Sequence, residues 1–167
     1  MTGRWLKNIM ATRQIVQEGN SFLRKKSREV TVFDSRLHTL LEDMAETMAA
    51  ANGVGLAAVQ VGVLRRVVLV HDGEKVCELI NPELVEADDE VEEDIEGCLS
   101  FPGQYGRVER PIRVKVKAQD RHGAPIELEG EGLTARAFCH EVDHLNGVLF
   151  VDLASEMLED LDELEQE

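Results

Sequence analysis

Apolar residues recur at helical spacing in two segments of the chain. Residues 35–50 are followed by Asn52-Gly53, a typical stop signal, and their apolar positions share one face: Leu37, Leu40, Leu41, Met44 and Met48. Residues 133–145 contain no glycine or proline, begin beside a possible cap at Thr134 and end at Asn146-Gly147. The spacing therefore predicts two helices.

Alternation of apolar and polar residues predicts two antiparallel hairpins. Residues 66–71 and 75–80 flank Asp72-Gly73, a pair that is typical of a tight turn. Residues 112–118 alternate cleanly, and residues 125–128 can pair back on them across a short turn. Helices combined with hairpins predict an α+β fold.

The end of the chain has the pattern of a third helix. Over residues 152–164 the apolar positions fall on one face: Leu153, Met157, Leu161 and Leu164. The 167 residues fit one domain, and no repeat or linker divides them. We therefore expect a single domain over residues 1–167, with residues 1–14 as an N-terminal extension and residues 153–167 as an acidic C-terminal helix.

Acidic residues outnumber basic ones, 33 to 18, and give a formal net charge of −15. This charge repels phosphate, so we expect no nucleic-acid partner. The acidic residues concentrate in residues 88–96 and again from residue 156 onward, which we interpret as a solvated loop and a solvated helix face.

Cysteine count and hydropathy bear on the compartment. Three cysteines, an odd number, argue against a disulfide framework and fit a reducing compartment. No apolar run approaches the roughly 20 residues that span a bilayer, and the N-terminus lacks the pattern of a signal peptide. The prediction is a cytoplasmic protein without a membrane partner.

Two histidines lie four residues apart in the predicted helix over residues 133–145. His140 and His144 project from the same face, so their imidazole nitrogens can bind one metal ion. Glu141 follows the first histidine directly and can reach a water beside the metal without being a ligand. The alternative interpretation of this H-E-x-x-H pattern is an exposed, charged helix face.

A catalytic metal site of this kind needs a third protein ligand. No histidine follows His144, and Asp152 and Glu156 belong to a differently placed segment. Upstream, Cys98 lies in E-G-C-L-S, where we expect a loop outside any strand. A thiol in such a loop suits a ligand, and the alternative is a small buried apolar residue.

A glycine-containing segment, G-V-G-L-A-A-V-Q, occupies residues 53–60. Its paired glycines let the backbone approach a ligand closely, and Gln60 offers an amide donor. The Lys-Ser/Thr ending of a phosphate-binding loop is absent.

In this order the three segments resemble the peptide deformylase family, of the bacterial type: GVGLAAVQ at residues 53–60, EGCLS at residues 96–100 and HEVDH at residues 140–144. The likeness covers roughly residues 15–152. It implies antiparallel sheets around a central metal-binding helix, with one helix in the N-terminal half and another at the C-terminus.

The resemblance implies a metal site and its ligands. Cys98, His140 and His144 would bind one divalent metal ion per chain, with water in the fourth position. The family's ion is Fe(II), for which Zn(II), Ni(II) or Co(II) can substitute, and these ligands suit all four. The metal would lower the pKa of its water and supply hydroxide at neutral pH.

The resemblance also implies a reaction, the removal of the N-formyl group, as formate, from the N-terminal formylmethionine of newly synthesised polypeptides. The water attacks the formyl carbon while Glu141 takes its proton and later passes it to the departing amine. The side-chain amide of Gln60 and the backbone N–H of Leu99 stabilise the negative charge on the formyl oxygen.

The substrate peptide is expected to pair, strand-like, with the backbone at Val54, Gly55 and Gly97. The methionine side chain needs an apolar pocket beside the metal, for which Val54, Leu133 and Ala137 are candidates. The last two face the same way as His140 on the predicted helix. Plain core packing is the alternative for these three.

Three further expectations concern residues around the motifs. Cys139 lies about 100° round the helix from His140, so we expect it to pack in the core rather than bind metal. Asp143 is expected to form a buried pair with an arginine such as Arg110. In some bacterial relatives a basic C-terminal helix docks on the ribosome; residues 153–167 are acidic, so we expect ribosome contact by that route to be weak or absent.

Two other functions stay open. A metallopeptidase of the H-E-x-x-H kind would release new amines from unformylated peptides, and the upstream Cys98 argues against it. A non-catalytic paralogue would bind metal or formyl-peptides without turnover, and the presence of Glu141, Gln60 and Cys98 together argues against that.

Overall fold

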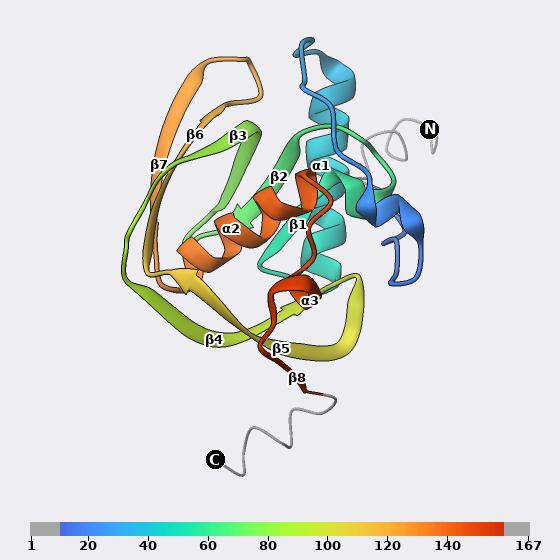
Figure 1. Ribbon diagram of the computed structural model, residues 1–167. Helices are drawn as coiled ribbons and strands as arrows, with labels where there is room; N and C mark the ends of the chain where they lie inside the picture. Colours follow the sequence, from blue (N-terminus) through green and yellow to red (C-terminus); the bar gives the residue numbers. More distant parts are fainter. Residues whose placement is uncertain (1–10, 159–167) are drawn as a thin grey trace.

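The computed structural model describes residues 11–158 as two antiparallel sheets with helices between and beside them (Figure 1). The two long helices have the predicted bounds, α1 over Ser35–Ala50 and α2 over Leu133–Leu145. Asp34 caps α1 by accepting from the N–H of Leu37. No side chain caps α2, which begins after Gly132, so the predicted cap at Thr134 is wrong.

The larger sheet has five strands, all antiparallel to their neighbours. Its order is β1 (Gly55–Ala57), β2 (Val67–His71), β3 (Val76–Ala87), β6 (Arg113–Gln119) and β7 (Pro125–Glu131). Both predicted hairpins are present, as β2–β3 and β6–β7. Two short 3-10 helices, η2 (Ser21–Arg24) and η3 (Ala58–Val61), complete this half of the molecule.

The smaller sheet has three strands, in the order β4 (Val91–Cys98), β5 (Phe101–Pro111) and β8 (Glu156–Leu158). The α+β class is confirmed, but two local predictions are wrong. The acidic run that we expected to be a loop continues into β4, so Cys98 ends a strand instead of lying in a loop. The predicted terminal helix is reduced to α3 (Phe150–Leu153), after which β8 pairs with β5. The rest of that prediction, residues 159–164, lies outside the described residues.

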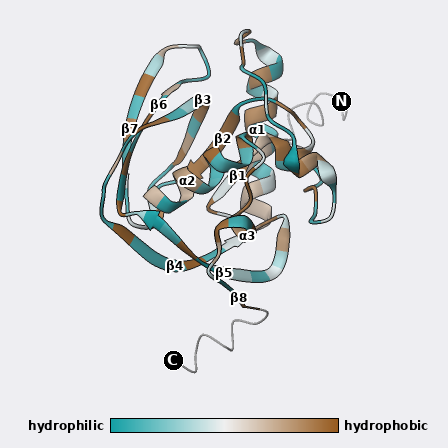
Figure 2. Cartoon of the chain, viewed as in Figure 1, coloured by the Kyte–Doolittle hydropathy of each residue, from teal (hydrophilic) through white to brown (hydrophobic). Residues whose placement is uncertain are grey.

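Strand β2 is buried on both faces. Val68 and Val70 pack into a cluster with Phe138 of α2, whereas Val67 and Leu69 pack into a second cluster with α1. A strand that is covered on both sides has a continuous apolar run rather than an alternation. Figure 2 shows this hydrophobic run along β2.

Helix α2 lies in the middle of the molecule, across the five-stranded sheet and beside β4 and β5 (Figure 1). Its apolar residues pack on that sheet, and a third cluster lies on the side of β5, formed by Leu23, Phe101, Val108, Leu149 and Phe150. The two sheets thus enclose the helix that carries both histidines. No helix of the described part is long and apolar enough to cross a membrane.

The chain leaves α2 through a glycine that has no room for a side chain. Gly147 has φ +74°, and a Cβ atom there would lie 2.3 Å from the backbone oxygen of Arg24. The guanidinium of Arg24 also pairs with Asp152, at 2.9 Å between Nη2 and Oδ1. Arg24 is therefore in direct contact with the segment that follows α2, residues 147–152.

We expect Gly147→Ala to lower the free energy of unfolding by about 2–4 kcal/mol, because the left-handed backbone and the overlap with Arg24 each add strain. Gly73→Ala is the matched control, since Gly73 also has positive φ (+99°) but has no atom within 4 Å of its Cβ position. Chemical denaturation measures both changes. Equal losses in the two variants would show that the contact with Arg24 contributes nothing.

Candidate metal and active site

Three potential metal ligands from two elements converge beside α2. The rings of His140 and His144 lie one helical turn apart, with their centroids 4.9 Å from each other. The Sγ atom of Cys98, at the end of β4, lies 3.3 Å from Nε2 of His144. The ligand atoms of these residues all lie within 4.8 Å of one another. One thiolate and two imidazoles in this arrangement fit a divalent transition-metal ion.

Gln60 joins the glycine-containing segment to the cysteine segment. It is buried in η3, where its Oε1 accepts from the N–H of Ala57 at 2.9 Å. Its Nε2 donates to Oγ of Ser100 at 3.1 Å and points to Sγ of Cys98 at 3.4 Å. The acceptor side of this amide is thus fixed, and its donor side faces the ligand cluster.

Glu141 lines the same pocket from α2. Its Oε1 lies 3.9 Å from Nε2 of His140, and its Oε2 is buried with no hydrogen-bond partner among the described residues. A Cβ atom at Gly55 would lie 2.6 Å from Oε1 of Glu141. Only glycine leaves room for the carboxylate, which explains one of the two glycines in the motif.

A chain of charged groups supports the first histidine. Oε1 of Glu96 lies 3.4 Å from Nδ1 of His140, and the guanidinium of Arg110 binds both oxygens of Glu96. Arg110 also donates to Oδ2 of Asp143 at 2.7 Å. The predicted pairing of Asp143 with Arg110 is therefore present, and it includes Glu96. A carboxylate on the outer nitrogen of a ligating histidine fixes the orientation of the ring.

Burial and neighbouring charges together shift the pKa values of these groups in the absence of a metal. Burial raises the pKa of Glu141 to about 7 and, together with the charge of His140, lowers the pKa of His144 well below its ordinary value. Burial would raise the pKa of Glu96, but His140 and Arg110 outweigh it and hold that pKa low. A neutral imidazole at His144 is the form that binds a metal.

The site opens into a pocket of about 400 Å³. All of the predicted residues except His144 line it, namely Val54, Gly55, Gln60, Gly97, Cys98, Leu99, Leu133, Ala137, His140 and Glu141. Leu133 and Val54 are 66% and 50% exposed and so are not core residues, whereas Ala137 is buried. His144 is buried beside the pocket lining.

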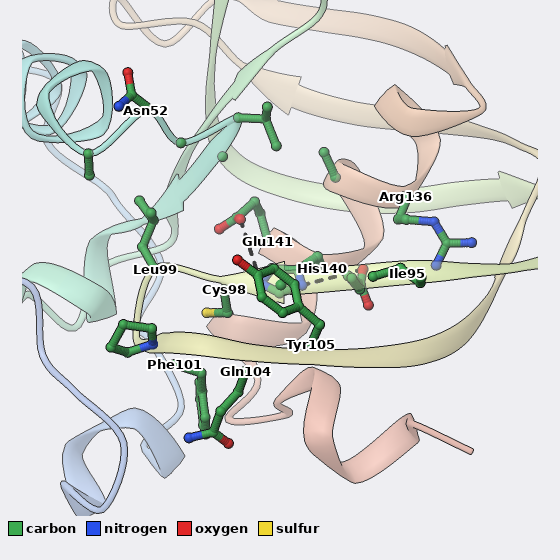
Figure 3. A pocket seen from close by; sticks show the side chains of 18 of the residues that line it. Asn52, Ile95, Cys98, Leu99, Phe101, Gln104, Tyr105, Arg136, His140 and Glu141 are labelled. Atoms are coloured by element: carbon green, nitrogen blue, oxygen red, sulfur yellow. Dashed lines mark ion pairs between the residues drawn. The ribbon is translucent and has the colours of Figure 1, made fainter. Parts of the chain in front are cut away.

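Three residues of the site had no role in the sequence analysis. Tyr105 lines the pocket (Figure 3), with its ring against Gly97, where a Cβ atom would lie 3.0 Å from Cε1 of Tyr105. Phe150 stacks on His140 with centroids 6.0 Å apart. Glu96 lies two residues before Cys98, and a strand there would have placed both side chains on one face.

Cys139 lies in the core cluster between α2 and the large sheet, as predicted. Burial raises the pKa of its thiol to about 11, so it stays protonated at neutral pH. Since the thiolate is the form that binds metal, Cys139 is unsuited to be a ligand in this position.

Comparison with known proteins identifies the family. The model of the polypeptide deformylase family matches residues 12–159. A peptide deformylase of Acetivibrio thermocellus is 55% identical over 157 residues, which cover 94% of this chain and 91% of that protein. The crystal structure of peptide deformylase from Thermotoga maritima superposes with a TM-score of 0.85 at 46% identity, covering 87% of this chain and 99% of the other.

A class I type b peptide deformylase from Acinetobacter baumannii, solved with Met-Ala-Ser bound, superposes with a TM-score of 0.82 at 34% identity, over 87% of this chain and 99% of that one. The region matched by the family model includes all three motifs and every residue of the pocket. On this likeness in sequence and fold, the chain belongs to the peptide deformylase family and is a hydrolase.

Proposed function

We propose that this chain hydrolyses the N-formyl group from the formylmethionine of nascent polypeptides by means of one divalent metal ion. The observation that carries the proposal is the buried Oε2 of Glu141, which lacks a partner among the described residues and lies beside the cluster of Cys98, His140 and His144. A carboxylate in that position can accept a proton from a water or return one.

Cys98, His140 and His144 hold the metal in this proposal, and Fe(II), Zn(II), Ni(II) and Co(II) all suit the ligand set. Such an ion supplies Lewis acidity, which lowers the pKa of a water and so provides hydroxide at neutral pH. Glu96 keeps Nδ1 of His140 engaged, and Phe150 covers the ring. Both contacts limit rotation of that imidazole.

Glu141 is the general base and acid of the proposed reaction. It accepts the proton from the attacking water and delivers it to the amine that leaves when the C–N bond to the formyl group breaks. Burial raises the pKa of Glu141 to about 7 in the metal-free chain, and a bound cation beside it would favour the ionised carboxylate that accepts the proton. The products are formate and a peptide with a free N-terminal methionine.

Gln60 and Leu99 are the proposed donors to the oxyanion that forms on the formyl carbon. The Nε2 atom of Gln60 faces the site and its Oε1 is held by Ala57, so the orientation of the amide is fixed before the substrate binds. Leu99 follows Cys98 directly in the turn between β4 and β5. Preorganised donors of this kind stabilise the transition state more than the substrate.

The pocket mouth fits an extended peptide with methionine first. Gly55 in β1, Val54 directly before it and Gly97 in β4 border the mouth with extended backbone. Leu133 and Ala137 provide an apolar wall from α2. The bound Met-Ala-Ser in the relative from Acinetobacter baumannii supports a short peptide as the occupant. We place this activity in the cytoplasm, acting on new chains without docking through the acidic C-terminal tail.

The test of the function is formate release from formyl-Met-Ala-Ser by protein prepared without oxygen, with metal content measured on the same sample. We expect release in proportion to bound metal and none after chelation. Fully loaded protein that releases no formate would refute the proposal. New amines from unformylated peptides would instead indicate a metallopeptidase.

We expect Glu141→Ala to reduce kcat at least about 10²-fold, because proton transfer loses its acceptor, while one metal ion per chain is retained. Metal content and turnover are measured on the same preparation. Glu131→Ala, which removes an exposed carboxylate outside the pocket that pairs with Arg113, is the control and should keep most activity. Unchanged turnover in Glu141→Ala would contradict its role.

We expect Gln60→Ala to lower kcat on the order of 10²-fold, since one oxyanion donor is worth about 3 kcal/mol. KM and metal content should change little. Gln60→Glu keeps the acceptor for Ala57 but loses the amide donor, and should be equally slow. If Gln60→Glu kept the activity of the parent, the amide would not be the donor.

A further inference from the structure

A short N-terminal segment, residues 15–18, spans the two halves of the site. The N–H of Val16 donates to the backbone oxygen of Gln60 at 2.7 Å. Two residues later, the N–H of Glu18 donates to the backbone oxygen of Ser100 at 2.8 Å. We call residues 15–18 the bridge segment, because one extended piece of chain bonds to the segments that carry both proposed oxyanion donors.

Those two segments come from different sheets. Gln60 lies in η3, which follows β1 of the five-stranded sheet, while Ser100 lies in the turn between β4 and β5 of the three-stranded sheet. Their direct link is the bond from Nε2 of Gln60 to Oγ of Ser100, and it uses the same side-chain amide that must also face the substrate. The bridge segment connects the same two segments by two backbone hydrogen bonds, and neither of them uses the side-chain amide of Gln60.

The bridge segment is itself held in place at both ends. Upstream, the guanidinium of Arg13 pairs with Asp43 of α1 at 2.9 Å, and the N–H of Arg13 donates to Oγ1 of Thr47 at 2.8 Å. Downstream, Oε2 of Glu18 accepts from Nε2 of Gln104 at 2.6 Å, on β5.

Between these ends, the side chain of Val16 packs against the cluster of Leu23, Phe101 and Phe150. These contacts hold the bridge segment in one position. The bridge segment can therefore keep a constant distance between the backbone at Gln60 and the backbone at Ser100.

We propose that Val16 and Glu18 are positioning residues, whose backbone N–H groups set the separation between the Gln60 amide and the Leu99 N–H. This inference rests on the proposed function, because it concerns the donors to the formyl oxygen. A donor displaced by a fraction of an ångström loses much of its effect on the transition state but little of its effect on substrate binding. Loosening the bridge segment should therefore lower kcat and leave KM nearly unchanged.

Single-atom backbone changes test this directly. An α-hydroxy acid analogue incorporated at position 16, or at position 18, replaces the N–H by an ester oxygen and keeps the side chain. Position 17 is the matched control, since the N–H of Gln17 makes no hydrogen bond within the described residues. Formate release is measured per bound metal, beside the thermal stability of each protein.

We expect the esters at positions 16 and 18 each to lower kcat about 10-fold at unchanged KM and metal content, and the ester at position 17 to match the parent. Equal kcat in all four proteins, an equal fall at position 17, or a change confined to KM or metal content would overturn the inference. A parent that releases no formate would refute the proposed function instead, which keeps the two failures distinct.

A second readout needs no turnover. The side-chain amide signals of Gln60 in a ¹⁵N spectrum, assigned with Gln60→Glu, should shift or broaden in the esters at positions 16 and 18 but not at position 17. Arg13→Ala removes the ion pair with Asp43 but keeps the backbone bond to Thr47 and the N–H groups of Val16 and Glu18, so it should produce a smaller shift of the same signals. Unmoved Gln60 signals in the esters at positions 16 and 18 and in Arg13→Ala would overturn the positioning role, even if activity fell.

Discussion

The fold depends on burying a helix that carries ionisable groups. Helix α2 lies between the two sheets, and His140, Glu141 and His144 are each almost fully buried there. A polar group in such surroundings is costly unless it has a partner. The partners of the two histidines, Glu96 and Cys98, come from β4, so the position of the smaller sheet is tied to the chemistry on the helix.

That compensation is incomplete in a way that fits a site of reaction. Nδ1 of His140 has Glu96, and Nε2 of His144 has Cys98, but Nδ1 of His144 and Oε2 of Glu141 find no partner among the described residues. Buried atoms left without partners are rare in folded proteins and often mark functional sites. For Glu141 the missing partner is the group on which it acts in the proposed reaction.

Arg110 neutralises the acidic groups behind His140. It binds Glu96 and Asp143 at once, while all three side chains are buried or half-buried. Removal of Arg110 would leave two carboxylates without a compensating cation, which costs far more than the loss of a surface pair. A chain with a net charge of −15 therefore places one of its 18 basic residues where the site needs a cation.

The sequence predicted those parts of the structure whose signals are local. Both long helices were located to the residue, because their apolar spacing and their stop signals lie within the segment itself. The hairpins follow from turn residues between alternating strands. The candidate metal ligands His140 and His144 were recognised because histidines four residues apart on a helix face one way, whichever fold surrounds them.

The parts that were missed depend on distant residues. Strand β4 carries acidic side chains on both faces near its start, so no alternation marks it, and its pairing with β5 decides its structure. Strand β8 has helical spacing in sequence but lies on β5 at Gly106, where a Cβ atom would be 2.9 Å from Met157. The packing of Met157 that requires glycine at position 106, and the contact of Glu96 with His140, both join residues that are far apart in the sequence. Neither can be recognised from neighbouring residues.

The double burial of β2 has a consequence for how the molecule comes apart. Its alternate residues belong to two separate hydrophobic clusters, one against α1 and one against α2, so a single backbone strand is common to both. Detaching either helix exposes one face of β2 to water. It also weakens the hydrogen bonds of β2 to β1 and β3, which hold the residues of the other face in their cluster. Unfolding should therefore be cooperative across the whole described chain, without a stable intermediate that has lost α1 and still holds the ligands on α2 in place.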